Sequence, residues 1–179
     1  MKRYCLYLFI LIGISCSAEL KAQKNGTVYK GNDPAVRYTG RTLVSPDGSV
    51  AFDWVGTYLE TRFTGGKLSV KVSETGTSYY NVFVDGKLHK VVKVCGTDTL
   101  IHLVSGIDKR IHSLKIQKRS EGEFGKTTVH QFVLSGSGRL AEEPAVRTRH
   151  IEFIGNSLTC GYGTDGKHRD EPFLVETEN

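Results

Sequence analysis

The chain has 179 residues, of which 39% are hydrophobic and 24% charged, and its net charge is +5. This length suits one good-sized core with at most a small second unit, and the composition excludes a disordered or fibrous protein. Basic residues are interleaved with acidic ones, so the charge does not indicate a nucleic-acid partner and we expect none.

The first 22 residues have the layout of a secretory signal. Two basic residues open the segment, an apolar stretch follows over residues 4–14, and small residues precede the expected cut near residue 22. The apolar stretch is too short to span a bilayer and stop there. We therefore predict a secreted or periplasmic protein with no membrane span. Lipid attachment at Cys16 is the less favoured alternative, because Gly13 stands where such signals usually carry Leu.

Residues 35–140 are predicted to be strands joined by turns, and nothing there shows helical periodicity. In "KLSVKVS" (67–73) apolar and polar residues alternate, which is typical of a strand with one buried face. Asp85-Gly86 is the strongest hairpin signal, and Gly65-Gly66 predicts a second hairpin. "SPDGS" (45–49) has the residues of a β-turn.

Other short runs have the same β-branched and aromatic character. They are "VRYTGRTLV" (36–44), "SVAFDW" (49–54), "DTLIHLV" (98–104), "HSLKIQKR" (112–119) and "VHQFVLS" (129–135). Turn signals recur at roughly eight- to twelve-residue intervals, which favours an antiparallel β-sandwich or jelly roll. We predict such a domain over residues 23–140.

The character of the chain changes after residue 140. "AEEPAVRTR" (141–149) is charged, lacks strand alternation and is predicted to be a linker. Residues 150–179 open with a β-branched and aromatic run and continue as a Gly-rich segment. Because about thirty residues cannot close a hydrophobic core alone, this tail either packs on the sandwich or begins a second domain. We expect it to be the least well packed part of the chain.

Within the tail, "IEFIGNSLTCGYG" (151–163) places Ser157 where a predicted strand ends in a turn. A serine at such a position exposes its hydroxyl, and its backbone N–H is no longer engaged in the ladder. A serine nucleophile also needs a general base and donors for the developing oxyanion. On the turn alone, catalysis and an ordinary strand-to-loop junction both remain open.

Other chemistry finds little support in the sequence. The six histidines lack metal-ligand spacing, and "SGSGRLA" (135–141) mimics a dinucleotide turn but is followed by a linker instead of a helix. We therefore predict no metal and no organic cofactor. Cys95 and Cys160 are the two cysteines outside the predicted signal, and whether they pair stays open.

The block "IEFIGNSLTCGYG" resembles the first conserved block of the SGNH (GDSL-type) hydrolases, and in detail that of the family 2 carbohydrate esterases. "VAFDWVGTYLETRFTGGKLSVKV" (50–72) and "GEFGKTTVHQFVLSGSGRL" (122–140) resemble that family's N-terminal jelly roll. The resemblance covers essentially the whole chain after the signal. It implies a jelly-roll sandwich followed by the first strand and nucleophile turn of a C-terminally truncated α/β SGNH hydrolase domain.

The resemblance also implies an activity and roles for individual residues. The family consists of secreted esterases that deacetylate plant polysaccharides such as acetylated xylan and glucomannan. Ser157 would be the nucleophile, and its backbone N–H would be one oxyanion donor. Asn156 stands where the family commonly has Asp, which puts any anionic support from that position in doubt. The oxyanion Gly and Asn and the catalytic His would lie beyond Asn179, because nothing here matches them; His168 is a poor candidate for the base.

Two interpretations follow. The favoured one is the N-terminal part of an acetylxylan-esterase-like serine hydrolase that acts on acetylated polysaccharide or oligosaccharide, with this fragment inactive without its hydrolase domain. The alternative is a non-catalytic carbohydrate-binding β-sandwich module that holds glycan on exposed aromatics. Trp54, Tyr58, Tyr79 and Tyr80 are the candidates, although their place in strand runs favours a core or domain-interface role.

Overall fold

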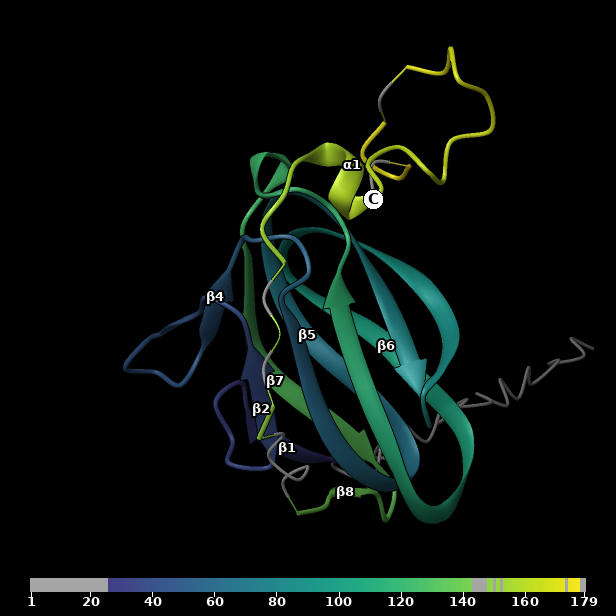
Figure 1. Ribbon diagram of the computed structural model, residues 1–179. Coiled ribbons are helices and arrows are strands. Elements are labelled where there is room, and N and C mark those ends of the chain that lie inside the picture. Colours follow the sequence, from purple (N-terminus) through teal and green to yellow (C-terminus); the bar gives the residue numbers. More distant parts are fainter. Residues whose placement is uncertain (1–25, 143–147, 150, 152, 173, 178–179) are drawn as a thin grey trace, which may run out of the picture.

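The structure is a computed structural model, and it describes residues 26–142, 148–149, 151, 153–172 and 174–177. The predicted signal and most of the predicted linker lie outside the described residues. The described part is mostly antiparallel strands (Figure 1). The elements are β1 (Thr27–Lys30), β2 (Val36–Thr39), β3 (Leu43–Val44), β4 (Val50–Phe52), β5 (Tyr58–Val84), β6 (Lys87–Lys118), the 3-10 helix η1 (Gly122–Phe124), β7 (Thr127–Ser135), β8 (Arg139–Leu140) and α1 (Ser157–Cys160).

Two long antiparallel strands, β5 and β6, form the frame of the fold. They are joined at Asp85 and Gly86, whose φ angles of 51° and 77° place both residues in the left-handed region. Two successive positive φ values are what a two-residue hairpin turn of type I′ requires. The hairpin predicted at this dipeptide is therefore confirmed, with Val84 paired to Lys87 across the turn.

The long hairpin folds back on itself and so builds two layers from two strands (Figure 1). The last stretch of β6 pairs with the beginning of β5, where Leu59 faces Ile116. The same stretch pairs with the end of β5, where Val82 also faces Ile116. One β6 segment thus lies between the two ends of β5, and the middle of β5 must cross to the other layer.

The crossing explains why the predicted second hairpin is wrong. Gly65 and Gly66 have positive φ angles of 33° and 77°, but the chain continues along β5 through them instead of reversing. Their partner strand bends at Gly106, which has φ 71°. A Cβ at Gly66 would also clash with the carbonyl oxygen of Ser135. The glycines therefore form a bend between layers and not a turn between strands.

The second layer is organised around β7 and the middle of β5. β7 pairs on its other side with β1 over its later residues and with β4 over its first residues. β3 extends this edge by pairing with β4, and β2 and β8 pair with β5. The result is an antiparallel β-sandwich, as the alternating sequence pattern predicts.

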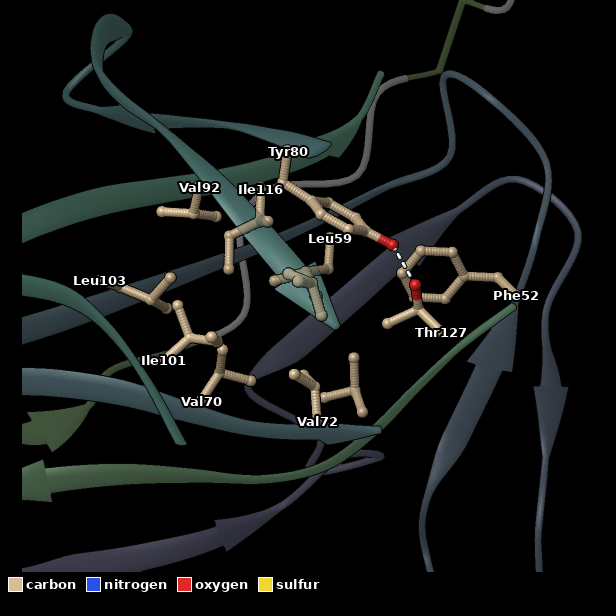
Figure 2. A pocket seen from close by; sticks show the side chains of 12 residues that line it. Phe52, Leu59, Val70, Val72, Tyr80, Val92, Ile101, Leu103, Ile116 and Thr127 are labelled. Atoms are coloured by element: carbon tan, nitrogen blue, oxygen red, sulfur yellow. Dashed lines mark hydrogen bonds between the residues drawn. The ribbon is translucent and has the colours of Figure 1, made fainter. Parts of the chain in front are cut away.

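The core lies between the two layers and consists of the inward-facing residues of the alternating runs. Figure 2 shows Leu59 and Ile116 from one layer opposite Val70, Val72 and Leu103 from the other. The space that they leave is a cavity of about 20 Å³ lined almost entirely by apolar side chains. This small void belongs to the hydrophobic core and is not a binding site.

The tail differs from the prediction at the segment before Ser157. The described residues among 151–156 form no strand. The large apolar side chains of Ile151, Phe153 and Ile154 are 80%, 81% and 91% exposed. A strand requires a neighbouring strand for its backbone hydrogen bonds, and none of the described strands pairs here. The tail is the most poorly packed described segment, as expected.

A buried histidine ties the β5–β6 turn to the bend at residues 106–110. His112 Nδ1 lies 2.7 Å from Asp85 Oδ2, and its Nε2 lies 2.9 Å from Asp108 Oδ1. The hydrogen bond to Asp85 and the second bond to Asp108 raise the pKa of His112, although its burial opposes them. The same contacts lower the pKa of both carboxyl groups. All three groups are therefore stabilised in their charged forms.

We expect the core to be most sensitive at Phe132 in β7, whose side chain is fully buried. Phe132→Ala should lower the free energy of unfolding by about 3–5 kcal/mol, because it removes apolar contacts and leaves a cavity. Urea denaturation followed by circular dichroism measures the loss. Leu43→Ala is the control, because Leu43 is 70% exposed and its truncation should change stability by less than about 0.5 kcal/mol. Equal losses would contradict this core assignment.

The histidine cluster predicts a pH dependence of stability. A raised pKa in the folded state stabilises the fold fully below the ordinary histidine value of about 6.5, and this contribution is lost as pH rises through the raised pKa. Above pH 6.5 we expect the free energy of unfolding to fall less steeply with pH in the His112→Gln variant than in the parent protein. Denaturant titrations between pH 6 and 9 measure this slope. The exposed His89 provides the control substitution His89→Gln, which should keep the parent slope.

Candidate functional site: the Ser157 turn and the pocket beside it

Ser157 is the first residue of the single-turn helix α1, and it is exposed. Asn156 precedes it in an extended conformation, and its Oδ1 accepts a hydrogen bond of 3.1 Å from the backbone N–H of Leu158. Asn is a good N-cap because its side-chain oxygen satisfies such an unpaired helix donor. Asn156 therefore orients the turn that presents Ser157, a role that needs an acceptor oxygen and no charge.

The turn closes on Gly161, which is left-handed with φ 76°. This conformation lets the chain reverse at the end of α1, as glycine commonly does after a helix. The backbone N–H of Tyr162 then donates to the Ser157 carbonyl oxygen at 2.9 Å. Ser157 and Tyr162 are thus parts of one hydrogen-bonded turn.

His168, the other candidate residue of the tail, lies on a later turn than Ser157. It is exposed there, and its carbonyl oxygen accepts a hydrogen bond from the Glu171 N–H at 3.1 Å. Cys95, at the far end of a strand pair in the sandwich, is an exposed free thiol. In the part of the chain that the structure describes, no group of three His, Cys, Asp or Glu residues could hold a metal ion.

The tail rests on one end of the sandwich (Figure 1). Asp165 forms an ion pair with Arg119, the residue that follows β6. The carbonyl oxygen of Val175 lies 3.5 Å from the Ser120 hydroxyl, at the limit of hydrogen bonding. These contacts place the Ser157 turn beside the loops that join β4 to β5 and β6 to β7.

A pocket of about 420 Å³ lies where the tail meets these loops. Trp54 and Tyr162 are its two aromatic residues, the first from the sandwich and the second from the tail. Asp53, Glu121 and Glu123 supply three carboxyl groups, and Gly122 completes the lining. Trp54 is 66% exposed, so much of its indole faces solvent.

Backbone contacts to Lys118 hold both loops of the pocket in place. The Gly56 N–H donates to the Lys118 carbonyl oxygen, and the Lys118 N–H donates to the Thr57 carbonyl oxygen, both at 2.9 Å. The Lys118 ammonium donates to the carbonyl oxygen of Gly125 at 2.7 Å, just after η1. One residue at the end of β6 therefore anchors the Trp54 loop and the η1 loop.

Lys118 is unusual because its side chain is only 1% exposed. Its ammonium also donates to the Ser78 hydroxyl at 2.8 Å. Burial lowers the pKa of Lys118, while the negative charges of Glu74 and Asp53 partly restore it. A buried ammonium is tolerated only where hydrogen-bond acceptors and nearby opposite charge replace its lost hydration.

Glu74 belongs to a second buried chain of polar groups beside Lys118. The Thr127 hydroxyl donates to the Glu74 carboxylate, and the Tyr80 hydroxyl forms a hydrogen bond with Thr127. Burial raises the pKa of Tyr80, which keeps its hydroxyl protonated. Figure 2 shows the Tyr80–Thr127 contact at the edge of the apolar core.

The four aromatic candidates from the sequence separate by burial. Tyr80 is a core residue, and Tyr58 and Tyr79 are half-buried. Lys115 Nζ lies 4.3 Å from the centre of the Tyr58 ring, so a cation occupies a face of that ring. Trp54 alone of the four is exposed, on the loop between β4 and β5.

Two features of the candidate site could not be read from the sequence motif. Tyr162 is part of the Ser157 motif, yet its position beside Trp54 depends on how the tail folds. Lys118 had a usable signal, because Leu114, Ile116 and Lys118 share the inward-facing positions of one alternating run. A lysine continuing an apolar register at the end of a strand indicates a buried anchor.

Comparison with known proteins places the chain in a family. Residues 38–144 match the family model "Carbohydrate esterase 2 N-terminal", and the chain belongs to this family. It is 33% identical over 148 residues to the cellulase/esterase CelE of Acetivibrio thermocellus, covering 83% of this chain and 18% of that protein. It is 29% identical over 135 residues to an acetylxylan esterase/glucomannan deacetylase of Cellvibrio japonicus, covering 75% of this chain and 37% of that protein.

Solved structures give the same result at the level of the fold. A family two carbohydrate esterase from Cellvibrio japonicus superposes with a TM-score of 0.76 at 26% identity, covering 86% of this chain and 45% of that one. A family two carbohydrate esterase from Clostridium thermocellum in complex with cellohexaose superposes with a TM-score of 0.75 at 33% identity, with coverages of 80% and 44%. The chain spans less than half the length of each of these relatives.

We expect the buried polar chain beside Lys118 to depend on Thr127. Thr127→Val should lower the free energy of unfolding by about 1–3 kcal/mol, because the Glu74 carboxylate and the Tyr80 hydroxyl each lose a buried partner. Thermal or urea unfolding measures this change. Thr128→Val is the matched control on the opposite face of β7, where the side chain is half-buried and no such chain is broken. A larger loss at Thr128 would contradict the assignment.

Proposed function

We propose that this chain is the N-terminal part of a secreted carbohydrate esterase that removes acetyl groups from plant polysaccharides such as acetylated xylan or glucomannan. The observation that carries the proposal is the Ser157 turn, exposed and capped by Asn156, directly after a sandwich of the carbohydrate esterase 2 family. The names of the curated relatives, an esterase and an acetylxylan esterase/glucomannan deacetylase, support the same substrate class.

The chemistry assigned to Ser157 is acyl transfer in two steps. A general base takes the hydroxyl proton while Oγ attacks the acetyl carbonyl carbon, and the backbone N–H of Ser157 helps to stabilise the oxyanion. The intermediate collapses, the sugar oxygen leaves with the proton returned by the base, and acetyl-serine remains. Water then attacks this ester, again with help from the base, and acetate is released as the serine is restored. The reaction uses no metal or organic cofactor.

The base and the remaining oxyanion donors are assigned to sequence beyond Asn179. We expect them to be a His, a Gly and an Asn of the hydrolase domain, which is the main partner of this sandwich. Residues 1–179 alone should therefore be inactive or nearly so, because a serine without a base and a complete oxyanion hole loses several powers of ten in rate.

Export fits this substrate, because plant cell-wall polysaccharides lie outside the cell. The N-terminal signal proposed for residues 1–22 would deliver the protein to the periplasm or the medium. Among the described residues, no helix is both long and apolar enough to cross a membrane.

The test is esterase activity of the full-length protein with its downstream sequence included. Ser157→Ala should reduce kcat/KM for 4-nitrophenyl acetate by at least about a thousandfold, because the nucleophile is removed. Release of acetate from acetylated xylan and glucomannan, measured in parallel, tests the substrate class.

Ser105→Ala serves as the matched control, because Ser105 is exposed on the sandwich and lies outside the site. It should keep the parental rate. Equal rates for Ser157→Ala and Ser105→Ala would refute the proposal. Full acetyl release by the isolated 179-residue chain would refute the assignment of the base to the downstream domain.

A further inference from the structure

We propose that Arg119 of the sandwich is a positioning residue for the reaction. Through its ion pair with Asp165, Arg119 holds the tail in the orientation that presents Ser157 to the base and the substrate. This inference rests on the proposed function and deepens it, because it gives the sandwich a part in the rate of the chemical step. Arg119 acts through Asp165 and the tail, and not by contact with the reacting atoms.

The first argument is that Arg119 is a fixed point at the end of the sandwich. Its side chain is only 14% exposed. Its backbone N–H donates to the Tyr79 carbonyl oxygen at 3.0 Å, and its Nη1 donates to Asn81 Oδ1 at 3.4 Å. Both partners belong to β5, so the backbone and the guanidinium are tied to the neighbouring strand. The planar guanidinium can donate to Asn81 and, through Nη2, to Asp165 at the same time.

The second argument is that Asp165 is connected to Ser157 by successive hydrogen-bonded turns. Three backbone N–H groups donate to carbonyl oxygens earlier in the tail at 2.9–3.0 Å, namely those of Tyr162 to Ser157, Thr164 to Gly161 and Gly166 to Gly163. Asp165 lies within the last of these turns. Fixing the Asp165 carboxylate on the sandwich therefore limits the positions that the Ser157 backbone can take.

The third argument is the contrast with another ion pair of the tail. Arg169 Nε lies 3.3 Å from Asp170 Oδ1, and the two side chains are 92% and 84% exposed. A pair between two such exposed side chains restrains the chain little, because water and salt screen it. The Arg119 guanidinium is mostly buried and is held by β5, so its pair with Asp165 is the stronger restraint.

The position of Ser157 matters for the rate more than for binding. Attack requires Oγ at about 3–3.5 Å from the acetyl carbon, and an error of about 1 Å can cost a hundredfold in rate. Loss of the ion pair should therefore lower kcat. An interaction that matters only in the transition state changes kcat without a matching change in KM.

Hydrogen exchange tests the restraint in the 179-residue chain, without any need for activity. Asp165→Ala should make amide exchange at Tyr162, Thr164 and Gly166, followed by NMR, at least about tenfold faster, because the turns open more easily. Asp170→Ala is the matched control, since it removes a tail carboxylate that is 84% exposed, and it should keep the parental exchange rates. Parental exchange in Asp165→Ala would overturn the inference.

Kinetics of the full-length protein test the effect on the reaction. Asp165→Ala and Arg119→Met should each lower kcat for 4-nitrophenyl acetate at least about tenfold and leave KM within about twofold. The double variant should be no slower than the slower single variant, because both changes remove one contact. Arg139→Met, exposed on β8 at the other end of the sandwich (Figure 1), is the control and should keep the parental kcat.

The outcomes separate this inference from the proposed function. If Ser157→Ala is inactive while Asp165→Ala keeps the parental kcat, the inference is overturned and the esterase assignment stands. Losses that multiply in the double variant would also overturn it, since the two residues would then act independently. A parental rate for Ser157→Ala would refute the proposed function and this inference together. Asp165→Ala leaves the sandwich unchanged, so it decides the question even where Arg119→Met does not fold.

Discussion

The pairing of one β6 segment with both ends of β5 is the constraint on which the rest of the structure depends. It folds a single long hairpin back on itself, so that the middle of each strand must pass into the opposite layer. The alternating apolar residues then meet between the layers, and β7 completes the second layer. Contacts between residues that are far apart along the chain therefore hold the sandwich together.

Lys118 is the last residue of that shared segment, and the end of the sandwich that carries the pocket is built around it. Its backbone holds the loop of Trp54, and its ammonium holds the loop after η1. An ammonium in the interior is costly unless it is surrounded by acceptors, and Ser78 and Gly125 supply them. The tail attaches one residue later, through Arg119 and Asp165. Lys118 is buried because it continues the alternating pattern of the core. Its contacts thus determine where the pocket and the Ser157 turn lie.

The local signals predicted most of the sandwich, and their failures have clear causes. Asp85-Gly86 and Gly65-Gly66 have similar turn chemistry, yet the first reverses the chain and the second only bends it. A positive φ angle is compatible with both outcomes, and the choice depends on which strand lies alongside. The run before Ser157 has strand composition but forms no strand among its described residues, because a strand also needs a partner. For the site, the motif singled out Ser157 and Asn156, whereas Tyr162 as a pocket wall could not be foreseen.

The sequence by itself determined the β class, the turn at Asp85-Gly86, the alternation that selects the core residues, and the resemblance of the segment around Ser157 to an esterase block. These properties are written in residue types and their spacing over a few positions, and they do not depend on distant parts of the chain. Only the tertiary structure decided that the long hairpin folds back, that Lys118 is internal and that Trp54 and Tyr162, more than a hundred residues apart in the chain, line one pocket. These features depend on long-range strand pairing and burial. All the strands together contribute the free energy of that pairing and burial.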